Sequence, residues 1–160
     1  MPASGSYFEH MVGNLLRYIE KAAGNGAYDA AEEAARVTKA SAQAVTTARV
    51  EAQAFAAALR VADGRTPAAA AAAVDRQTGN VFLGHSGETI EVPVSLRSRL
   101  PDPSLEPWSA TNCAEVAAYS RALSGGASFD DLTVWTVRTR TGEYFPPCDN
   151  CSTWLPGRKR

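Results

Sequence analysis

Several features of membrane-spanning, secreted or disordered chains are missing from these 160 residues. No run of about 18 consecutive apolar residues occurs, so we expect no transmembrane helix. Residues 1–6 lack the basic and then apolar stretch of a signal peptide, which favours a cytoplasmic location. Apolar residues make up 45% of the chain, as in an ordinary folded domain, so a wholly disordered chain is excluded.

Neither sign of charge is in excess. The chain has 16 lysines and arginines against 17 aspartates and glutamates, which excludes a strongly basic nucleic-acid coat but not a local basic groove. Local basic clusters can hold a few phosphates, or they can simply keep the chain soluble. They are Arg97 with Arg99, Arg138 with Arg140, and the tail Arg158-Lys159-Arg160.

Cysteine and histidine are also scarce, with three and two residues. An odd number of cysteines does not suit a fully paired disulfide framework. The thiols are therefore better interpreted as metal ligands or nucleophiles.

Turn-forming residues are rare in residues 27–62, and alanine is abundant there. We expect one helix over about residues 7–23, ended by Gly24-Asn25-Gly26, and a second over about 29–62. A stripe of mostly small side chains predicts the packed face of the second helix. This face covers the rest of the chain as part of an Ala-rich helical hairpin in residues 1–66, or it binds another copy or a partner. The stripe consists of Ala30, Ala34, Val37, Ser41, Ala44, Ala48, Glu51, Phe55, Ala58 and Ala62.

Residues 67–160 show a different pattern, which predicts a second domain. The runs 68–75 and 80–84 flank Arg76-Gln77-Thr78-Gly79 and indicate a β-hairpin, although the alanines at 68–73 also have helical propensity. Residues 112–123 predict a helix, 132–139 a strand, and Pro147 begins a last short helix through Trp154. We therefore expect an α/β fold, with helices packed on a small mixed sheet.

All three cysteines fall in two short motifs, Cys113-Ala114-Glu115 and Pro147-Cys148-Asp149-Asn150-Cys151. Each motif lies at the start of a predicted helix. In the second motif, Cys148 and Cys151 are three residues apart, so their side chains point to the same side of the helix. Three thiolates make a zinc site whose fourth position stays free for water, which is typical of catalytic zinc. Glu115 would then lie beside the metal, where a carboxylate can carry a proton from water to a departing amine.

This constellation resembles the zinc-dependent nucleobase deaminase superfamily, whose signature is a His or Cys, any residue, Glu, and then Pro-Cys-x-x-Cys. Over residues 68–155 the chain is most similar to the YwqJ-like deaminases of bacterial toxins, on two further stretches. They are Val81-Phe82-Leu83-Gly84-His85-Ser86-Gly87 and Asn112-Cys113-Ala114-Glu115-Val116.

The resemblance implies a cytidine-deaminase-like fold in residues 67–160. It also implies that Cys113, Cys148 and Cys151 bind Zn²⁺ and that Glu115 shuttles protons during hydrolytic deamination. The target base, cytosine or adenine, and its carrier, nucleic acid, nucleotide or nucleoside, stay open. A toxin would be delivered into a target-cell cytoplasm and would need an immunity protein. Superfamily members usually have further strands after the Pro-Cys-x-x-Cys helix, and only residues 152–160 follow it here.

Four residues are weaker candidates for binding the substrate. His85 and Ser86 follow the hairpin and either reach the substrate or belong to a surface loop. Asn112 contacts the substrate or caps the helix that follows it. Trp108, in a proline-rich stretch, is a candidate pocket lid that stacks on a base, whereas Trp135 and Trp154 are expected in the core.

Two other interpretations of the cysteines stay open. A structural zinc would need a fourth ligand from His85 or from a partner chain. Such a chain would be a non-enzymatic module that binds a partner through its Ala-rich helices. A redox dithiol at Cys148 and Cys151 would leave the Cys113-Ala114-Glu115 motif unexplained.

Overall fold

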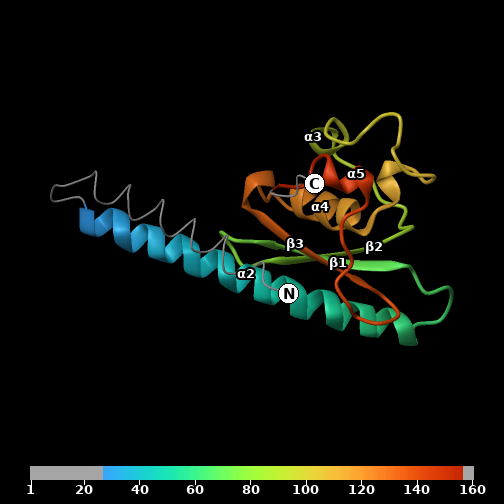
Figure 1. Ribbon diagram of the computed structural model, residues 1–160, viewed down its shortest axis with the longest axis horizontal. Helices are drawn as coiled ribbons and strands as arrows, with labels where there is room; N and C mark the ends of the chain where they lie inside the picture. The colour runs from blue at the N-terminus through green and yellow to red at the C-terminus, as the bar shows by residue number, and fades with distance from the viewer. Residues whose placement is uncertain (1–26, 157–160) are drawn as a thin grey trace. The chain divides into compact units, whose positions relative to one another are not determined.

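The computed structural model describes residues 27–156, and the chain divides into two units, Met1–Ala42 and Gln43–Arg160. The second unit contains all the strands of the described chain and the helices that pack on them (Figure 1). The elements are α2 (Ala27–Val61), β1 (Ala69–Asp75), β2 (Val81–His85), α3 (Val94–Arg97), α4 (Ala114–Ser124), β3 (Leu132–Arg138) and α5 (Asp149–Ser152), with short 3-10 helices at Ala110–Asn112 and Phe129–Asp131.

The strands form one sheet in the order β2-β1-β3. The predicted hairpin is confirmed, because β1 pairs antiparallel with β2 and Gly79 takes the positive φ of 77° that the turn needs. β3 returns antiparallel on the other side of β1. The sheet is therefore antiparallel throughout residues 27–156, and the expectation of a mixed sheet is wrong for this part of the chain. A parallel pair would need a strand beyond α5, where the described chain has only residues 153–156.

β1 is an alanine strand that lies between helices on both faces of the sheet. Ala69, Ala71 and Ala73 face the cluster that includes α4, whereas Ala70 and Ala72 face α2. The strand prediction for the alanine run is thus confirmed over its helical propensity. Small side chains bury little area each, but they let a helix approach closely from either side. Figure 1 shows the resulting layers, with α2 below the sheet and α4 and α5 above it.

The predicted second helix is confirmed as α2, but its packed face agrees with the prediction only in part. Among the residues of the predicted stripe, Ala44 and Ala48 are buried and Phe55 is partly buried against the core, whereas Ala30, Val37 and Ala58 are exposed. The stripe did not include the buried residues Ala52 and Ala56. On this sheet the helix buries a single row of residues spaced four apart, whereas the prediction had assumed spacings that alternate between three and four residues. The helix predicted over residues 7–23 lies outside the described residues. The hairpin it would form and the domain division at residues 66 and 67 stay predictions.

The predicted helix and strand of the second domain are confirmed as α4 and β3, and the last short helix as α5. Residues 88–113 are mostly irregular apart from α3 and the short 3-10 helix, and include a cis bond before Pro103. In the described part of the chain, no helix combines the length and the apolar character that crossing a membrane requires.

Candidate metal centre

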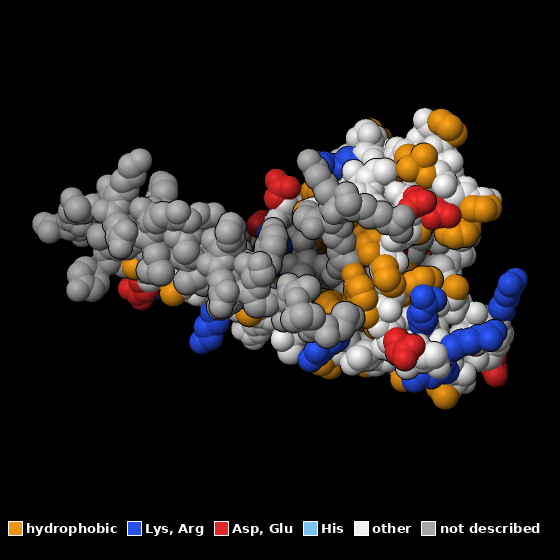
Figure 2. All heavy atoms as spheres, in the orientation of Figure 1, with side chains coloured by type: hydrophobic (Ala, Val, Ile, Leu, Met, Phe, Trp, Pro, Cys, Tyr) orange, Lys and Arg blue, Asp and Glu red, His pale blue; other side chains and the backbone are white. Residues whose placement is uncertain are grey.

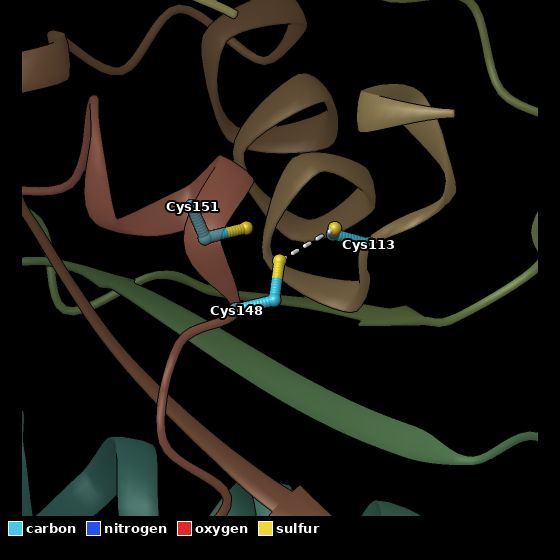
Figure 3. Close-up of side chains that lie close together, drawn as sticks. All are labelled: Cys113, Cys148 and Cys151. Atoms are coloured by element: carbon cyan, nitrogen blue, oxygen red, sulfur yellow. Dashed lines mark hydrogen bonds between the residues drawn. The ribbon is translucent and has the colours of Figure 1, made fainter. Parts of the chain in front are cut away.

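The three cysteines meet at the starts of α4 and α5. All three Sγ atoms lie within 4.8 Å of one another, and the Sγ atoms of Cys113 and Cys148 are 3.4 Å apart. Figure 3 shows the side chains pointing toward a common centre, Cys113 from the start of α4 and the other two from α5. Cys151 is fully buried, whereas Cys148 is half-buried. The predicted cysteine cluster is therefore present.

The sulfur positions fit a metal ion. Zinc binds thiolates at about 2.3 Å in tetrahedral geometry, which places neighbouring sulfurs about 3.8 Å apart. The observed spacing needs only small side-chain shifts to reach that value. Among residues 27–156 no histidine or carboxylate joins the three sulfurs as a further ligand. The triad can thus hold a metal ion.

The three thiols change one another's acidity. Hydrogen bonds from Cys113 and from Cys151, together with backbone N–H groups, lower the pKa of Cys148 below that of a free thiol. The hydrogen bond with Cys148 raises the pKa of Cys113, and those with Cys113 and Cys148 raise the pKa of Cys151. The cluster therefore favours a thiolate at Cys148 over one at either of the other two sulfurs.

A close contact between α4 and β2 fixes the position of Cys113. A Cβ added at Gly84 would lie 2.6 Å from the Ala114 carbonyl oxygen and 2.8 Å from the Ala117 Cβ. Only glycine allows the first turns of α4 to rest directly on β2. Cys113 is the N-cap residue of this helix, so its sulfur is held at the edge of the contact.

Glu115 lies in the first turn of α4 and is 6% exposed. Its Oε2 atom is 3.7 Å from the Cys151 Sγ, so the carboxyl group lies beside the sulfur triad and not among its closest atoms. Burial raises the pKa of Glu115, whereas hydrogen bonds from its own backbone N–H and from the Thr136 hydroxyl act in the opposite direction. Burial is the largest of these effects, so the carboxyl group of Glu115 holds its proton more tightly than an exposed one.

The centre opens into a pocket of about 480 Å³. Cys113, Cys148 and Glu115 line this pocket, whereas Cys151 lies behind it. The volume falls in the range of small-molecule sites, about 300 to 1,000 Å³. A small substrate can therefore reach two of the sulfurs and the carboxyl group together.

Three of the four weaker candidates line the same pocket, namely Ser86, Trp108 and Asn112. The Ser86 hydroxyl accepts hydrogen bonds from the backbone N–H groups of residues 68 and 69. Trp108 is 44% exposed. Asn112 does not cap α4, because Cys113 occupies the N-cap position, and the Asn112 side chain is exposed. These positions suit substrate contacts, and their roles stay predictions.

His85 does not line this pocket. Its Nε2 atom lies 3.2 Å from the Glu88 carboxylate and its Nδ1 atom 2.9 Å from the Ser86 carbonyl oxygen. Glu88 in turn pairs with Arg121 of α4. His85 therefore belongs to a network that fixes the loop after β2, and it lines a second hollow beside the pocket.

Sequence reasoning missed several residues of the site. Thr136 and Phe145 line the pocket, and Thr136 is buried in β3. The signal for Thr136 was a hydroxyl inside an otherwise apolar run, Val134-Trp135-Thr136-Val137. No local signal marked Phe145, because it reaches the pocket only through the turn after β3.

Asn150, between the two cysteines of α5, was also missed. It is fully buried, and its Oδ1 accepts the Leu105 N–H at 2.7 Å while its Nδ2 donates to the Ser104 hydroxyl at 3.0 Å. The Ser104 hydroxyl also lies 2.5 Å from the Trp108 carbonyl oxygen. Asn150 therefore ties the segment 104–108, which carries Trp108, to the metal-binding turn.

Comparison of the chain with models of known families, with curated proteins and with solved structures found no match in any of the three. The chemistry of the site must therefore be argued from its residues.

Proposed function

We propose that the chain is a zinc-dependent hydrolytic deaminase, which replaces the exocyclic amine of a cytosine-type or adenine-type base by oxygen and releases ammonia. The observation that carries the proposal is the open sulfur triad, which shares a pocket with Glu115. A structural zinc is normally closed by four protein ligands, and residues 27–156 bring only three together. The resemblance to YwqJ-like deaminases supports the same function.

Cys113, Cys148 and Cys151 would hold the zinc ion. The bound ion would supply a Lewis acid that lowers the pKa of a water molecule from its bulk value to about 7. Cys113 and Cys148 expose their sulfurs to the pocket, and Cys151 anchors the site from the buried side.

Glu115 moves the protons. Its carboxylate takes a proton from the attacking water and donates it to the amine nitrogen that leaves, so water is consumed and ammonia released. The protein prepares this group by burying it, which brings its pKa toward the working pH. The Thr136 hydroxyl holds the carboxylate in place through a hydrogen bond.

The walls of the pocket suit a flat, polar ring. Trp108 and Phe145 offer aromatic surface on which a base can stack. The exposed Asn112 amide has both donors and an acceptor for the edge of a base. These contacts would turn the amine-bearing carbon toward the sulfurs.

The test combines metal analysis with an ammonia assay on Glu115→Gln, in which the side chain keeps its shape but cannot carry a proton. We expect one zinc per chain in both proteins and a fall in ammonia release of about 10²- to 10⁴-fold in the variant. Glu91→Gln is the matched control, because Glu91 is exposed and is not among the residues that line the pocket. The screen uses nucleosides, nucleotides, single strands and duplexes.

Two results would contradict the proposal. Full activity of Glu115→Gln would remove the carboxylate from the chemistry. A zinc with four protein ligands and no activity on any base would instead favour a zinc-stabilised module that binds a partner through its Ala-rich helices.

The toxin resemblance extends the proposal to delivery into a target cell and to an immunity protein that blocks the pocket. Expression of the chain in bacteria should arrest growth, and Glu115→Gln should not. Protection by a protein encoded beside the chain would identify the immunity partner. Self-association through the N-terminal helices is measured in the same preparations by light scattering.

A further inference from the structure

A second hollow of about 940 Å³ adjoins the metal-site pocket. The two are continuous, because five residues line both of them. The shared residues are Ala68, Ser86, Asn112, Arg138 and Phe145. A molecule whose base fills the pocket would therefore extend into this hollow.

Basic side chains line the second hollow and carboxylates do not. Arg65, Arg138, Arg140 and His85 are among its lining residues, which include no aspartate or glutamate. We name this surface the arginine groove. Figure 2 shows Lys and Arg side chains gathered near the end of α2 and the turn after β3, with acidic side chains nearby but outside the lining.

The guanidinium groups of the groove have no carboxylate partner among residues 27–156. Arg138 packs over the Phe145 ring, with its Cζ atom 4.0 Å from the ring centroid, and this contact leaves its N–H donors free. Five other arginines among residues 27–156 differ, since their guanidinium groups pair with a carboxylate or donate to backbone carbonyls. These are Arg36, Arg60, Arg76, Arg97 and Arg121.

Hydrogen bonds hold the backbone around the groove in place. Arg60 of α2 donates to the Thr139 carbonyl oxygen at 2.7 Å, and the Thr139 N–H donates to the Ala68 carbonyl oxygen at 3.1 Å. The Arg138 carbonyl oxygen accepts the Gly142 N–H at 2.8 Å, which closes the turn that carries Arg140. The free guanidinium groups are therefore presented on a fixed frame, which reduces the entropy that binding an anion would cost.

We propose that the arginine groove binds the phosphate groups of the substrate while its base occupies the metal-site pocket. This inference rests on the proposed deaminase function and narrows its substrates to nucleotides, free or within a strand. Guanidinium groups bind phosphate oxygens in pairs of parallel hydrogen bonds, and three unpaired ones exceed what a neutral nucleoside can use. Arg138 lines both hollows, so it would hold the phosphate nearest to the target base.

The experiment measures binding, not turnover, in the zinc-loaded full chain that carries Glu115→Gln. The probe is a fluorescently labelled mixed-sequence single strand, as DNA and as RNA, followed by anisotropy over a range of salt concentrations. Unlabelled cytidine and adenosine compete in one series, and their monophosphates in another. Arg138→Gln and Arg140→Gln are compared with Arg49→Gln, which removes an exposed arginine outside both hollows.

We expect Arg138→Gln and Arg140→Gln each to weaken strand binding about tenfold. The slope of log affinity against log salt should become shallower by about 0.7 for each lost phosphate contact, and Arg49→Gln should change neither quantity. Competition by the monophosphates but not by the nucleosides also supports the groove, and shows that free nucleotides are among its ligands.

Equal competition by nucleosides and their monophosphates would overturn the inference, as would equal losses in Arg49→Gln and the groove variants. A different result would reject the deaminase function and leave the groove standing. In that case the groove would still bind phosphate, but the chain with Glu115 intact would release no ammonia from any substrate. Ammonia release from nucleotides that is as fast in Arg138→Gln and Arg140→Gln as in the unsubstituted chain would reject the groove alone.

Discussion

Gly84→Ala tests whether the contact between β2 and α4 sets the geometry of the metal centre. The added methyl group would meet backbone atoms of α4, at 2.6 Å from the Ala114 carbonyl oxygen, and the Ala117 Cβ at 2.8 Å. Neither neighbour is the free end of a long side chain, so neither can turn away. The helix itself has to move away from the sheet.

The size of the effect follows from these distances. Ordinary contacts between such atoms lie at about 3.5 Å or more, so α4 must shift by on the order of 1 Å. Overpacking of this kind costs about 1–3 kcal/mol of folding free energy. Cys113 begins α4, so its sulfur moves away from Cys148 and Cys151 with the helix. We expect zinc affinity to fall about 10- to 100-fold, as when the residues that orient a metal ligand are changed.

The assay is a zinc titration against a chromophoric chelator, together with thermal unfolding of the metal-free protein. Gly126→Ala is the matched control, because Gly126 lies after the far end of α4, has φ +94° and has open space around it. It costs about 1–2 kcal/mol through backbone strain alone. We expect the two variants to lose similar stability and only Gly84→Ala to lose zinc affinity. Equal zinc affinity in both would refute the role of the contact.

The remaining predictions concern metal binding and the segment 104–108, which contributes Trp108 to the pocket. Zinc at a hundredfold excess over its Kd should stabilise the fold by about 2.7 kcal/mol, and a chelator should abolish this gain. Because the pKa values of Cys113 and Cys151 are raised and that of Cys148 is lowered, zinc binding near neutral pH should release about two protons. Calorimetry in buffers of different ionisation enthalpy counts them, and binding without proton release would contradict the charge assignment. Asn150→Ala should destabilise the chain by about 1–3 kcal/mol and speed hydrogen exchange at Leu105, whereas Asn150→Asp keeps the acceptor. Unchanged hydrogen exchange at Leu105 in Asn150→Ala would show that Asn150 does not hold the segment 104–108 in place.

The sequence was most informative where local pattern and packing agree. The hairpin, α4 and β3 were predictable because the signals for them are local. The spacing of apolar residues and the identity of turn residues can be recognised within a few neighbouring positions. The packed face of α2 was predicted only in part, since Ala44, Ala48 and Phe55 pack on the core but Ala52 and Ala56 were missed. Alanine occurs on several sides of this helix, so composition alone cannot say which row meets the sheet.

The cysteine cluster was predictable for a different reason. Chemistry restricts which residues can gather around a cation, so the two cysteine motifs predicted that their sulfurs would meet without any knowledge of the intervening fold. The rest of the pocket depends on tertiary structure. Arg65 and Arg138 are brought to one hollow by the turn after α2 and the end of β3, and no local pattern links these segments.

The alanine strand explains how so small a sheet can hold the cysteine cluster in place. In β1 every side chain is buried, and alternate alanines face α4 and α2. Larger residues there would push both helices outward and would separate Cys113 from the sulfurs of α5, which follows β3 in the chain. The substitution Ala71→Val adds two methyl groups on the α4 face, whereas Ala72→Val adds them on the α2 face. Both overpack the core, but only the first acts on the layer that carries the metal ligands, so loss of zinc affinity in Ala71→Val alone is the result that this explanation requires.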